Sequence, residues 1–351
     1  MTEALVEYDR TAQRASNPEP STPAEQAEIG LALRRILVPL DGSPLAESVL
    51  PYVVEITRAT PARVTLLQVL EVTGGMATGR RHIDAIEWEM ARAESQAYLT
   101  SIATRLQAEQ LGAQIELVQG RAPEQITLYA KRQAVDLIAL ATHGDGSPHA
   151  WTLGGTVQKI IAGAATSILI VPSHVPPAAA PVRLRRMLLP LDCSQRAECI
   201  LPAATELARR CDAELVLAHV VPEPEMPRRM GATQEDRELA RRLVESNRRA
   251  ASRYLRDVQS RLARVSDRVQ VRLCVAARQA QTLHEMAQRE AIDLVILSAH
   301  GSTGDAHQRY GMVAAEFLQA GYRPVIILQD LGASVRDERP AEAPRTERAG
   351  A

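Results

Sequence analysis

The sequence contains very few aromatic residues, and this scarcity excludes one class of function. Phe, Trp and Tyr make up only 3% of the 351 residues. The cores must therefore be built from aliphatic side chains, and the aromatic platforms that stack single-stranded nucleic acid are not expected. The formal net charge is only −1, so no overall field attracts nucleic acid or a membrane surface. We expect neither of them as a partner.

Cysteine is also scarce and unevenly placed. No two cysteines form a Cys-x-x-Cys pair, and all four lie in the second half of the chain, at Cys193, Cys199, Cys211 and Cys274. Neither a disulfide framework nor a metal site is indicated, and we expect buried or half-buried thiols in a cytoplasmic protein. No signal-peptide pattern opens the sequence, and no apolar run approaches the ~20 residues that a membrane helix needs.

What the sequence does contain is a repeated pair of motifs. Ile36–Ser43 returns as Met187–Ser194, an offset of 192 − 41 = 151 between the aspartates. Asp136–Gly144 returns as Asp293–Gly301, an offset of 301 − 144 = 157. Because both motifs recur in the same order at a domain-sized period, we predict two homologous domains.

The composition between and around the repeats predicts the boundaries of the domains. We expect domain 1 at 34–172 and domain 2 at 185–329, joined by a Pro- and Ala-rich linker at 173–184. Polar, Pro-containing tails without periodicity precede and follow them, and we predict that the tails are mobile. The tails span residues 1–33 and 330–351.

Each predicted domain alternates short apolar runs with helical patterns. The expected strands are 36–40, 64–69, 115–118, 136–141 and 167–171, then 187–191, 214–220, 269–275, 293–298 and 325–328. Because these runs are nearly continuous rather than alternating, we expect strands that are buried on both faces. Five strands separated by helices predict an α/β fold with a doubly wound, five-stranded parallel sheet in each domain.

Three helices carry more specific expectations. Ser43 is expected to cap a helix over residues 43–58, with Glu47 as its capping partner. A long helix over 83–111 is expected to end at Gly112. Its counterpart in domain 2, about 234–262, is rich in arginine. Acidic residues interleave with those arginines, so a solvated face and a patch that binds anions or nucleic acid are alternative interpretations.

The repeated motifs fall at the carboxyl ends of strands, where open parallel sheets bind ligands. Asp41 follows the first strand, and His143-Gly144 follows the fourth. Nine residues then lead to Gly154 and a helix, with the same spacing from Gly301 to Gly311. Glycines before a helix let backbone N–H groups approach an anion. Since an aspartate can accept hydrogen bonds from a sugar hydroxyl or a base amine, the combination predicts an adenine-nucleotide cleft.

On these motifs the chain resembles a tandem universal stress protein. The strand-Pro-x-Asp-x-Ser opening and the Asp-Leu-Ile/Val…His-Gly block carry the resemblance over about 34–172 and 185–329. It implies a fold like that of the adenine-nucleotide alpha hydrolases, with the strand order 3-2-1-4-5. It also implies that the fifth strands pair, so that the two halves form an internal pseudo-dimer, and it leaves a homodimer open. The implied ligand is ATP, alone or with Mg²⁺.

The resemblance also assigns residues to each cleft. In domain 1 the implied nucleotide site is Pro39, Asp41, Val69, Ala141, His143, Gly144, Gly154, Gly155 and Thr156. In domain 2 the implied site is Pro190, Asp192, Val220, Ser298, Gly301, Gly311 and Met312.

Both clefts depart from the family's phosphate loop. The hydroxyl residue that follows the last glycine is replaced by Gly155 and Met312, which removes a hydrogen bond worth roughly 1.5–3 kcal/mol. Thr156 is a candidate substitute in domain 1. Asp145 and Asp305 bring like charge to the loops, which disfavours a triphosphate unless a divalent ion bridges them, and Pro148 constrains the first loop. We therefore expect a weakened first site and a more degenerate second one.

Structural roles compete with binding at three pairs of positions. The aspartates would cap the following helices, the histidines would pack in their loops, and the glycines would only start helices. These residues are Asp41 and Asp192, His143 and His300, and Gly154 and Gly311. His149 and His307, inside the two loops, are expected to face solvent.

No catalytic motif accompanies the clefts. The sequence has no nucleophile elbow, Walker loop, dinucleotide fingerprint or metal-spaced histidine pair. Our leading hypothesis is a cytoplasmic stress-response protein, not an enzyme, that binds adenine nucleotide chiefly in domain 1. The second hypothesis is a nucleotide-free interaction protein whose clefts are both vestigial. A slow ATPase is the third.

Overall fold

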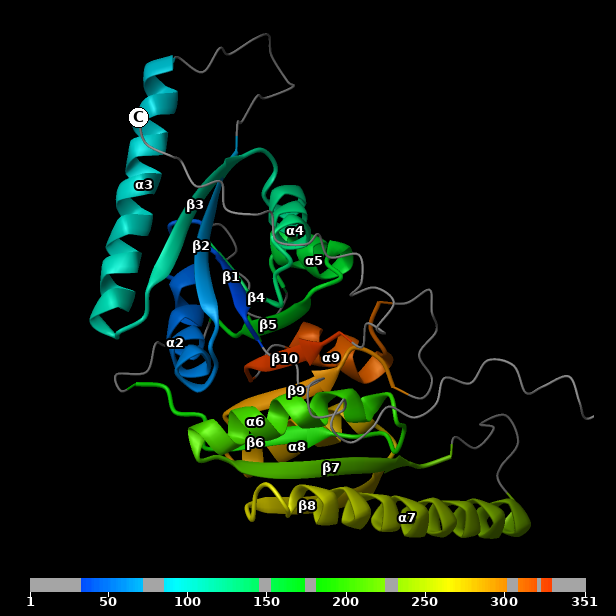
Figure 1. Cartoon of the computed structure of the whole chain (residues 1–351). Coiled ribbons are helices and arrows are strands. Elements are labelled where there is room, and N and C mark those ends of the chain that lie inside the picture. The colour runs from blue at the N-terminus through cyan, green and yellow to red at the C-terminus, as the bar shows by residue number, and fades with distance from the viewer. Residues whose placement is uncertain are drawn as a thin grey trace, which may run out of the picture.

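The computed structural model describes residues 33–71, 85–144, 153–173, 181–224, 233–301, 309–320 and 323–329. Within them, one ten-stranded sheet has the order β3-β2-β1-β4-β5-β10-β9-β6-β7-β8 (Figure 1). The strands are β1 Arg35–Pro39, β2 Arg63–Leu70, β3 Ala113–Gln119, β4 Leu137–Ala141, β5 Ser167–Val171, β6 Arg186–Pro190, β7 Glu214–Pro222, β8 Val269–Ala276, β9 Leu294–Ser298 and β10 Val325–Leu328. The predicted tails apart from Leu33, most of the linker, and Asp145, Pro148, His149, Asp305 and His307 lie outside the described residues. Leu33 was predicted wrongly as part of a mobile tail, because its side chain is buried in the core.

Each half of this sheet is parallel and has the same strand order. β1 lies between β2 and β4, while β6 lies between β7 and β9. β3 and β5 complete the first half, and β8 and β10 complete the second. Both halves therefore have the order 3-2-1-4-5, and the predicted doubly wound α/β fold is confirmed.

The two halves meet through their fifth strands. β10 pairs with β5 in the antiparallel direction, with Val325 opposite Ile170 and Ile327 opposite Ile168. Strands β3 and β8 are left at the two ends of the sheet (Figure 1). The family resemblance implied this pairing of the fifth strands. That the two domains act together as an internal pseudo-dimer stays a prediction.

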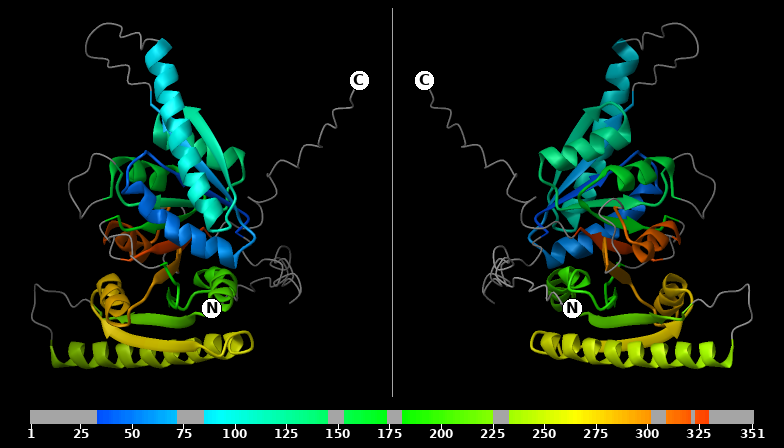
Figure 2. Two further views of the ribbon diagram at one scale, coloured as in Figure 1. Left: turned by 90° about the vertical axis from the view of Figure 1, so that its left-hand side faces the viewer. Right: turned by 90° about the vertical axis from the view of Figure 1, so that its right-hand side faces the viewer.

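Helices cover both faces of the sheet. The helical segments are η1 Ala46–Val49, α2 Leu50–Ala59, α3 Ala85–Ala108, α4 Ala122–Arg132, α5 Gly155–Gly163, η2 Ala197–Ile200, α6 Leu201–Cys211, α7 Gln234–Leu262, α8 Gln279–Arg289 and α9 Met312–Ala320. α2, α3, α6 and α7 pack on one face, and α4, α5, α8 and α9 on the other. The two long helices, α3 and α7, lie at opposite ends of the molecule (Figure 2).

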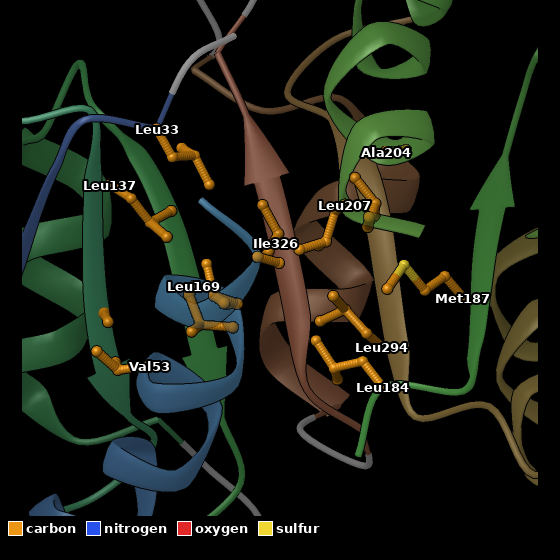
Figure 3. Close-up of a cluster of buried hydrophobic side chains, with 14 of the residues drawn as sticks. Leu33, Val53, Leu137, Leu169, Leu184, Met187, Ala204, Leu207, Leu294 and Ile326 are labelled. Carbon is orange, nitrogen blue, oxygen red and sulfur yellow. The ribbon is translucent and has the colours of Figure 1, made fainter. Parts of the chain in front are cut away.

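One apolar cluster crosses the junction between the halves. Val53 of α2, Leu169 of β5, Leu207 of α6 and Ile326 of β10 all belong to it and are all buried (Figure 3). Burying an aliphatic side chain of this size contributes about 1.5–3 kcal/mol. The junction is therefore held by apolar burial as well as by strand hydrogen bonds.

Burial of the strands follows their position in the sheet. Every residue of β4 and of β5 is buried, as the continuous apolar runs predicted. The same expectation is wrong for β3, in which no residue is fully buried, and for most of β8. These are edge strands, so one side has no neighbouring strand to exclude solvent.

The first helical segment differs in part from its prediction. Residues 43–58 divide into η1 and α2, and Ser43 Oγ accepts a hydrogen bond from the N–H of Ala46 at 3.1 Å. Ser43 therefore binds the first N–H of η1, although the N-cap position itself is held by Leu45. Glu47 is not its partner, because the Glu47 carboxylate binds side chains of α3 instead. α3 ends at Ala108, and the left-handed residue after it is Gln110 (φ 63°), not Gly112.

The arginine-rich helix α7 begins and ends at the predicted residues, Gln234 and Leu262. Thr233 and Asp236 form a capping box at its start. Five of its arginines pair with acidic side chains three or four positions earlier, and Glu238 alone binds both Arg241 and Arg242 at 3.0 Å. Because these charges are paired on the helix surface, the solvated-face interpretation is favoured over an anion-binding patch.

Candidate functional site

The residues assigned to each cleft gather at the carboxyl ends of three strands. Pro39 ends β1, Ala141 ends β4, and Val69 lies near the end of β2. β1 and β4 are neighbours, and the strand order reverses between them. This is the topological switch point at which open α/β sheets bind ligands. In the second half Pro190, Ser298 and Val220 occupy the matching ends of β6, β9 and β7.

In both halves an aspartate carboxylate lies directly against a glycine. A Cβ atom added to Gly144 would lie 1.8 Å from Asp41 Oδ2, and one added to Gly301 would lie 2.1 Å from Asp192 Oδ2. A side chain at either glycine would occupy the space that the carboxylate now fills. The two repeated motifs are therefore in contact across the strand ends, which explains why both halves have glycine at this position.

The aspartates also brace the turn that follows the first strand. Asp41 Oδ1 accepts the N–H of Ser43 at 2.9 Å. In the second half Asp192 Oδ1 accepts both the N–H and the hydroxyl of Ser194, at 3.0 and 2.6 Å. The serine hydroxyls in turn accept the N–H groups of Ala46 and Ala197, each at 3.1 Å. The serines rather than the aspartates thus bind the first N–H groups of η1 and η2, and Asp41 remains exposed at the cleft.

The glycine that ends each loop is fastened to the end of the fourth strand. The N–H of Gly154 donates to the carbonyl of Thr142 at 2.9 Å, and that of Gly311 to the carbonyl of Ala299 at 2.8 Å. α5 then begins at Gly155, which has open space on the side where a Cβ would point. The first N–H groups of a helix have no partner within the helix. Together with the helix dipole they can receive an anion at this point.

The first helical residue after each loop glycine is exposed. Gly155 and Thr156 are the first two residues of α5, and both are exposed. Thr156 supplies a hydroxyl at this point. Met312 opens α9 with 67% of its surface exposed and supplies no hydroxyl. Gly154 serves as N-cap without a side chain, so no capping side chain competes for the N–H groups of α5.

His143 and His300 differ in their surroundings. His143 is 5% exposed, and its Nδ1 lies 3.1 Å from Thr142 Oγ1 and 3.3 Å from Ser173 Oγ. Its Nε2 is buried without a hydrogen-bond partner among the described residues. His300 is half-buried, and its backbone carbonyl accepts the Ser298 hydroxyl at 2.7 Å. His143 therefore has the structural role that the sequence left open as an alternative to ligand binding: it packs in its loop, where it contacts two hydroxyl groups.

The second cleft has a different chemical character from the first. Cys193 occupies the position of Gly42, and both residues have positive φ, 68° and 89°. Cys193 Sγ lies 3.7 Å from Nδ1 of His219, whose position in the first half is held by Gln68. Burial and the neighbouring Asp192 raise the pKa of the Cys193 thiol to about 11, so it stays protonated near neutral pH.

The four cysteines are thiols that form no disulfide with one another. Cys211 and Cys274 are half-buried as expected, but Cys193 and Cys199 are exposed, because they lie in and just after the turn that follows β6. Within the described ranges, no three His, Cys, Asp or Glu side chains are grouped so that they could hold a metal ion. Nor does any helix in this part of the chain have the length and apolarity needed to cross a bilayer.

Sequence reasoning missed two features of the clefts. A cluster of Glu47, Tyr98 and Arg105 anchors the turn after β1 to α3. The Cys193–His219 pair occupies the matching region of the second half. Comparing the repeats position by position would have revealed both, since Glu198, Tyr254 and Arg261 are the counterparts of the first cluster.

A groove of about 1040 Å³ lies outside both clefts. α5, α8 and α9 line it at the junction of the halves, with Ile161, His284 and Leu318 among its walls. Residues 145–152 and 302–308, which lead into α5 and α9, are not among the described residues, so the clefts are defined by the strand ends and helix starts given above.

A model of the universal stress protein family matches the chain twice, over residues 32–172 and 183–329. The chain therefore belongs to the universal stress protein family and contains two universal stress protein domains. This membership supports a role in stress response.

The chain is similar to individual members over one domain or over both. A universal stress protein of Methanocaldococcus jannaschii is 24% identical over 140 residues, which are 39% of this chain and 81% of that protein. The crystal structure of a universal stress protein from Archaeoglobus fulgidus has a TM-score of 0.58 at 14% identity, covering 85% of this chain and 98% of that one. A putative universal stress protein from Pseudomonas aeruginosa also has a TM-score of 0.58, at 16% identity, covering 85% and 94%. At these identities the solved structures establish the fold.

Proposed function

We propose that this universal stress protein binds an adenine nucleotide, chiefly ATP, in its first cleft. The observation that carries the proposal is the contact between Asp41 and Gly144 beside the first turn of α5. An exposed carboxylate and an uncapped helix N-terminus stand at the same strand ends. One end of the cleft suits hydroxyl or amine donors and the other suits an anion, which is the chemistry of a nucleotide.

The residues present fit such a ligand. Asp41 would accept hydrogen bonds from the ribose hydroxyls or the base, beside Pro39 and Val69 at the ends of their strands. The N–H groups of Gly155 and Thr156, with the Thr156 hydroxyl, would receive the phosphates. A bound ATP would supply the negative charge and the adenosine shape that these residues recognise. Mg²⁺ would offset the repulsion between the phosphates and nearby carboxylates.

The second cleft is proposed to be degenerate. Met312 removes the hydroxyl and presents an exposed thioether at the helix start. Cys193 and His219 replace a glycine and a glutamine beside Asp192. The first change removes a polar group at the helix start, and the second places a thiol side chain where the first cleft has only the backbone of a glycine.

The proposal is for binding and not for turnover, because the hydroxyls that lie beside His143, those of Thr142 and Ser173, are buried together with it and are not presented to a ligand as a nucleophile. We further propose that the two domains act as an internal pseudo-dimer in the cytoplasm, where the four thiols would remain reduced. The second candidate function is a nucleotide-free interaction protein, which is favoured by the missing hydroxyl at Gly155.

Calorimetric titration with ATP and Mg²⁺ tests the proposal. We expect the unmodified chain to bind ATP in the micromolar range. We expect Asp41→Ala to weaken this binding by about 10- to 100-fold, which corresponds to the loss of a charged hydrogen bond. Asp192→Ala is the matched control, since it removes the same turn contact from the other half. No binding heat in the unmodified chain refutes the proposal and favours the nucleotide-free function. Equal weakening by both variants refutes the assignment to the first cleft.

A further inference from the structure

A three-residue cluster joins the long helix α3 to the turn that carries Asp41. Glu47, in η1, accepts hydrogen bonds from Arg105 Nη1 at 2.6 Å and from the Tyr98 hydroxyl at 3.3 Å. Only 21% of the Glu47 side chain is exposed. Burial, then Glu47 and Asp41, raise the pKa of the Tyr98 phenol, so its hydroxyl stays protonated as the donor.

The second half contains the same charged pair, although the Tyr254 hydroxyl beside it is buried without a hydrogen-bond partner among the described residues. Glu198, in η2, accepts a hydrogen bond from Arg261 Nη2 at 2.7 Å, and 20% of its side chain is exposed. Tyr254 takes the place of Tyr98, and burial together with Glu198 raises its pKa. In a chain with only seven tyrosines, two occupy equivalent positions beside the two aspartate turns. The same charged contact, with the same exposure, has thus formed in both domains.

This cluster connects to Asp41 through a short series of hydrogen bonds. Glu47 lies in η1, whose first N–H, that of Ala46, donates to Ser43 Oγ. The N–H of Ser43 donates to Asp41 Oδ1. On its other side the Asp41 carboxylate lies against Gly144. A displacement of η1 would therefore move Ser43 and change the direction in which Asp41 points.

We propose that Glu47, held by Tyr98 and Arg105, is a positioning residue that fixes Asp41 for the ligand of the first cleft. The ligand in this inference is the nucleotide of the proposed function, on which the inference rests. The restraint of Asp41 by Glu47 does not depend on that function. A carboxylate that must meet two hydroxyls or a base edge has to be held in place, because small displacements weaken hydrogen bonds steeply. Glu47 supplies that restraint without touching the ligand itself.

The test compares Glu47→Ala with Glu198→Ala, which removes the matching ion pair from the other half. Both variants are expected to lose similar thermal stability. Glu47→Ala alone weakens the binding of Mg²⁺-ATP by about tenfold, as expected for the loss of one well-directed hydrogen bond. Hydrogen exchange measured by mass spectrometry in peptides covering residues 41–49 rises about tenfold in Glu47→Ala, while in Glu198→Ala the rise occurs at 192–200 instead.

Two outcomes overturn the proposal. Unchanged exchange over residues 41–49 in Glu47→Ala means that the cluster does not restrain the turn. Faster exchange with unchanged ATP affinity means that the restraint does not act on Asp41.

If the unmodified chain binds no ATP, the proposed function fails, and the exchange of the Ser43 amide, which donates to Asp41, decides the positioning role alone. If Glu47→Ala does not fold, Tyr98→Phe repeats the test, because it removes only a single hydroxyl. Tyr254→Phe is its control in the other half. The conservative variant Glu47→Gln, which keeps an acceptor oxygen, is expected to recover most of the affinity.

Discussion

Replacing Gly144 by alanine would test the contact that defines the first cleft. The new Cβ would lie 1.8 Å from Asp41 Oδ2, so the carboxylate would have to move by about 1.6 Å to reach the 3.4 Å of an ordinary contact. Gly144 does not have the positive φ that alanine disfavours. The backbone therefore accepts the substitution, and the contact with Asp41 is its main obstacle.

The cost of that movement follows from what Asp41 holds. Its carboxylate would have to release the N–H of Ser43, now 2.9 Å away. Because Asp41 is exposed, water replaces part of this interaction, and we expect Gly144→Ala to lower the free energy of unfolding by about 1–2 kcal/mol. A displaced Asp41 should weaken the binding of ATP by about tenfold, since each 1.4 kcal/mol changes an equilibrium constant about tenfold.

A double-mutant cycle measured by urea denaturation isolates the clash. In an Asp41→Ala background the alanine at position 144 meets no carboxylate, so the same substitution should have little effect on stability there. Gly301→Ala, which would bring its Cβ within 2.1 Å of Asp192 Oδ2, should destabilise the chain similarly without changing ATP affinity. If Gly144→Ala costs the same free energy with and without Asp41, the contact is not the reason for glycine at this position.

Two further predictions concern the second domain. Cys193 has φ 68° where the first domain has Gly42, so Cys193→Gly should raise the free energy of unfolding by about 1 kcal/mol in thermal melts, and an equal or lower stability would argue against strain. Hydrogen bonding from Arg272 lowers the pKa of Glu290 below 4.5, so its stabilising contribution is complete above that pH and disappears as the pH falls through the lower, folded-state pKa. The difference in unfolding free energy between the unmodified chain and Glu290→Gln, measured at pH 7 and at acid pH, should shrink on acidification, and a constant difference would contradict this.

Local sequence patterns predicted much of the fold. The apolar runs of β5 and β10 and the polar, charged length of α7 begin and end where the patterns indicated. These features depend on neighbours along the chain, such as the Thr233–Asp236 capping box, and therefore leave a clear signal. The edge strands β3 and β8 were misjudged because burial depends on which strands lie beside them.

The aspartates and glycines of the clefts were predictable for another reason. Asp41 and Gly144, like Asp192 and Gly301, recur with nearly the same spacing in both halves, and the sequence alone shows that repetition. The role of Glu47 was predicted wrongly as that of a local capping partner. Its actual partner Arg105 is 58 residues away, and no pattern near Glu47 in the sequence predicts that ion pair.

The sequence by itself thus determined the two domains, their parallel sheets and the residues at the strand ends, because hydrophobic runs and turn residues act over short distances along the chain. Only the tertiary structure decided that Asp41 Oδ2 lies against Gly144 and that Glu47 is held by α3. Each of these contacts joins residues that are far apart in sequence, and close packing and strand pairing, rather than local propensity, select among such contacts.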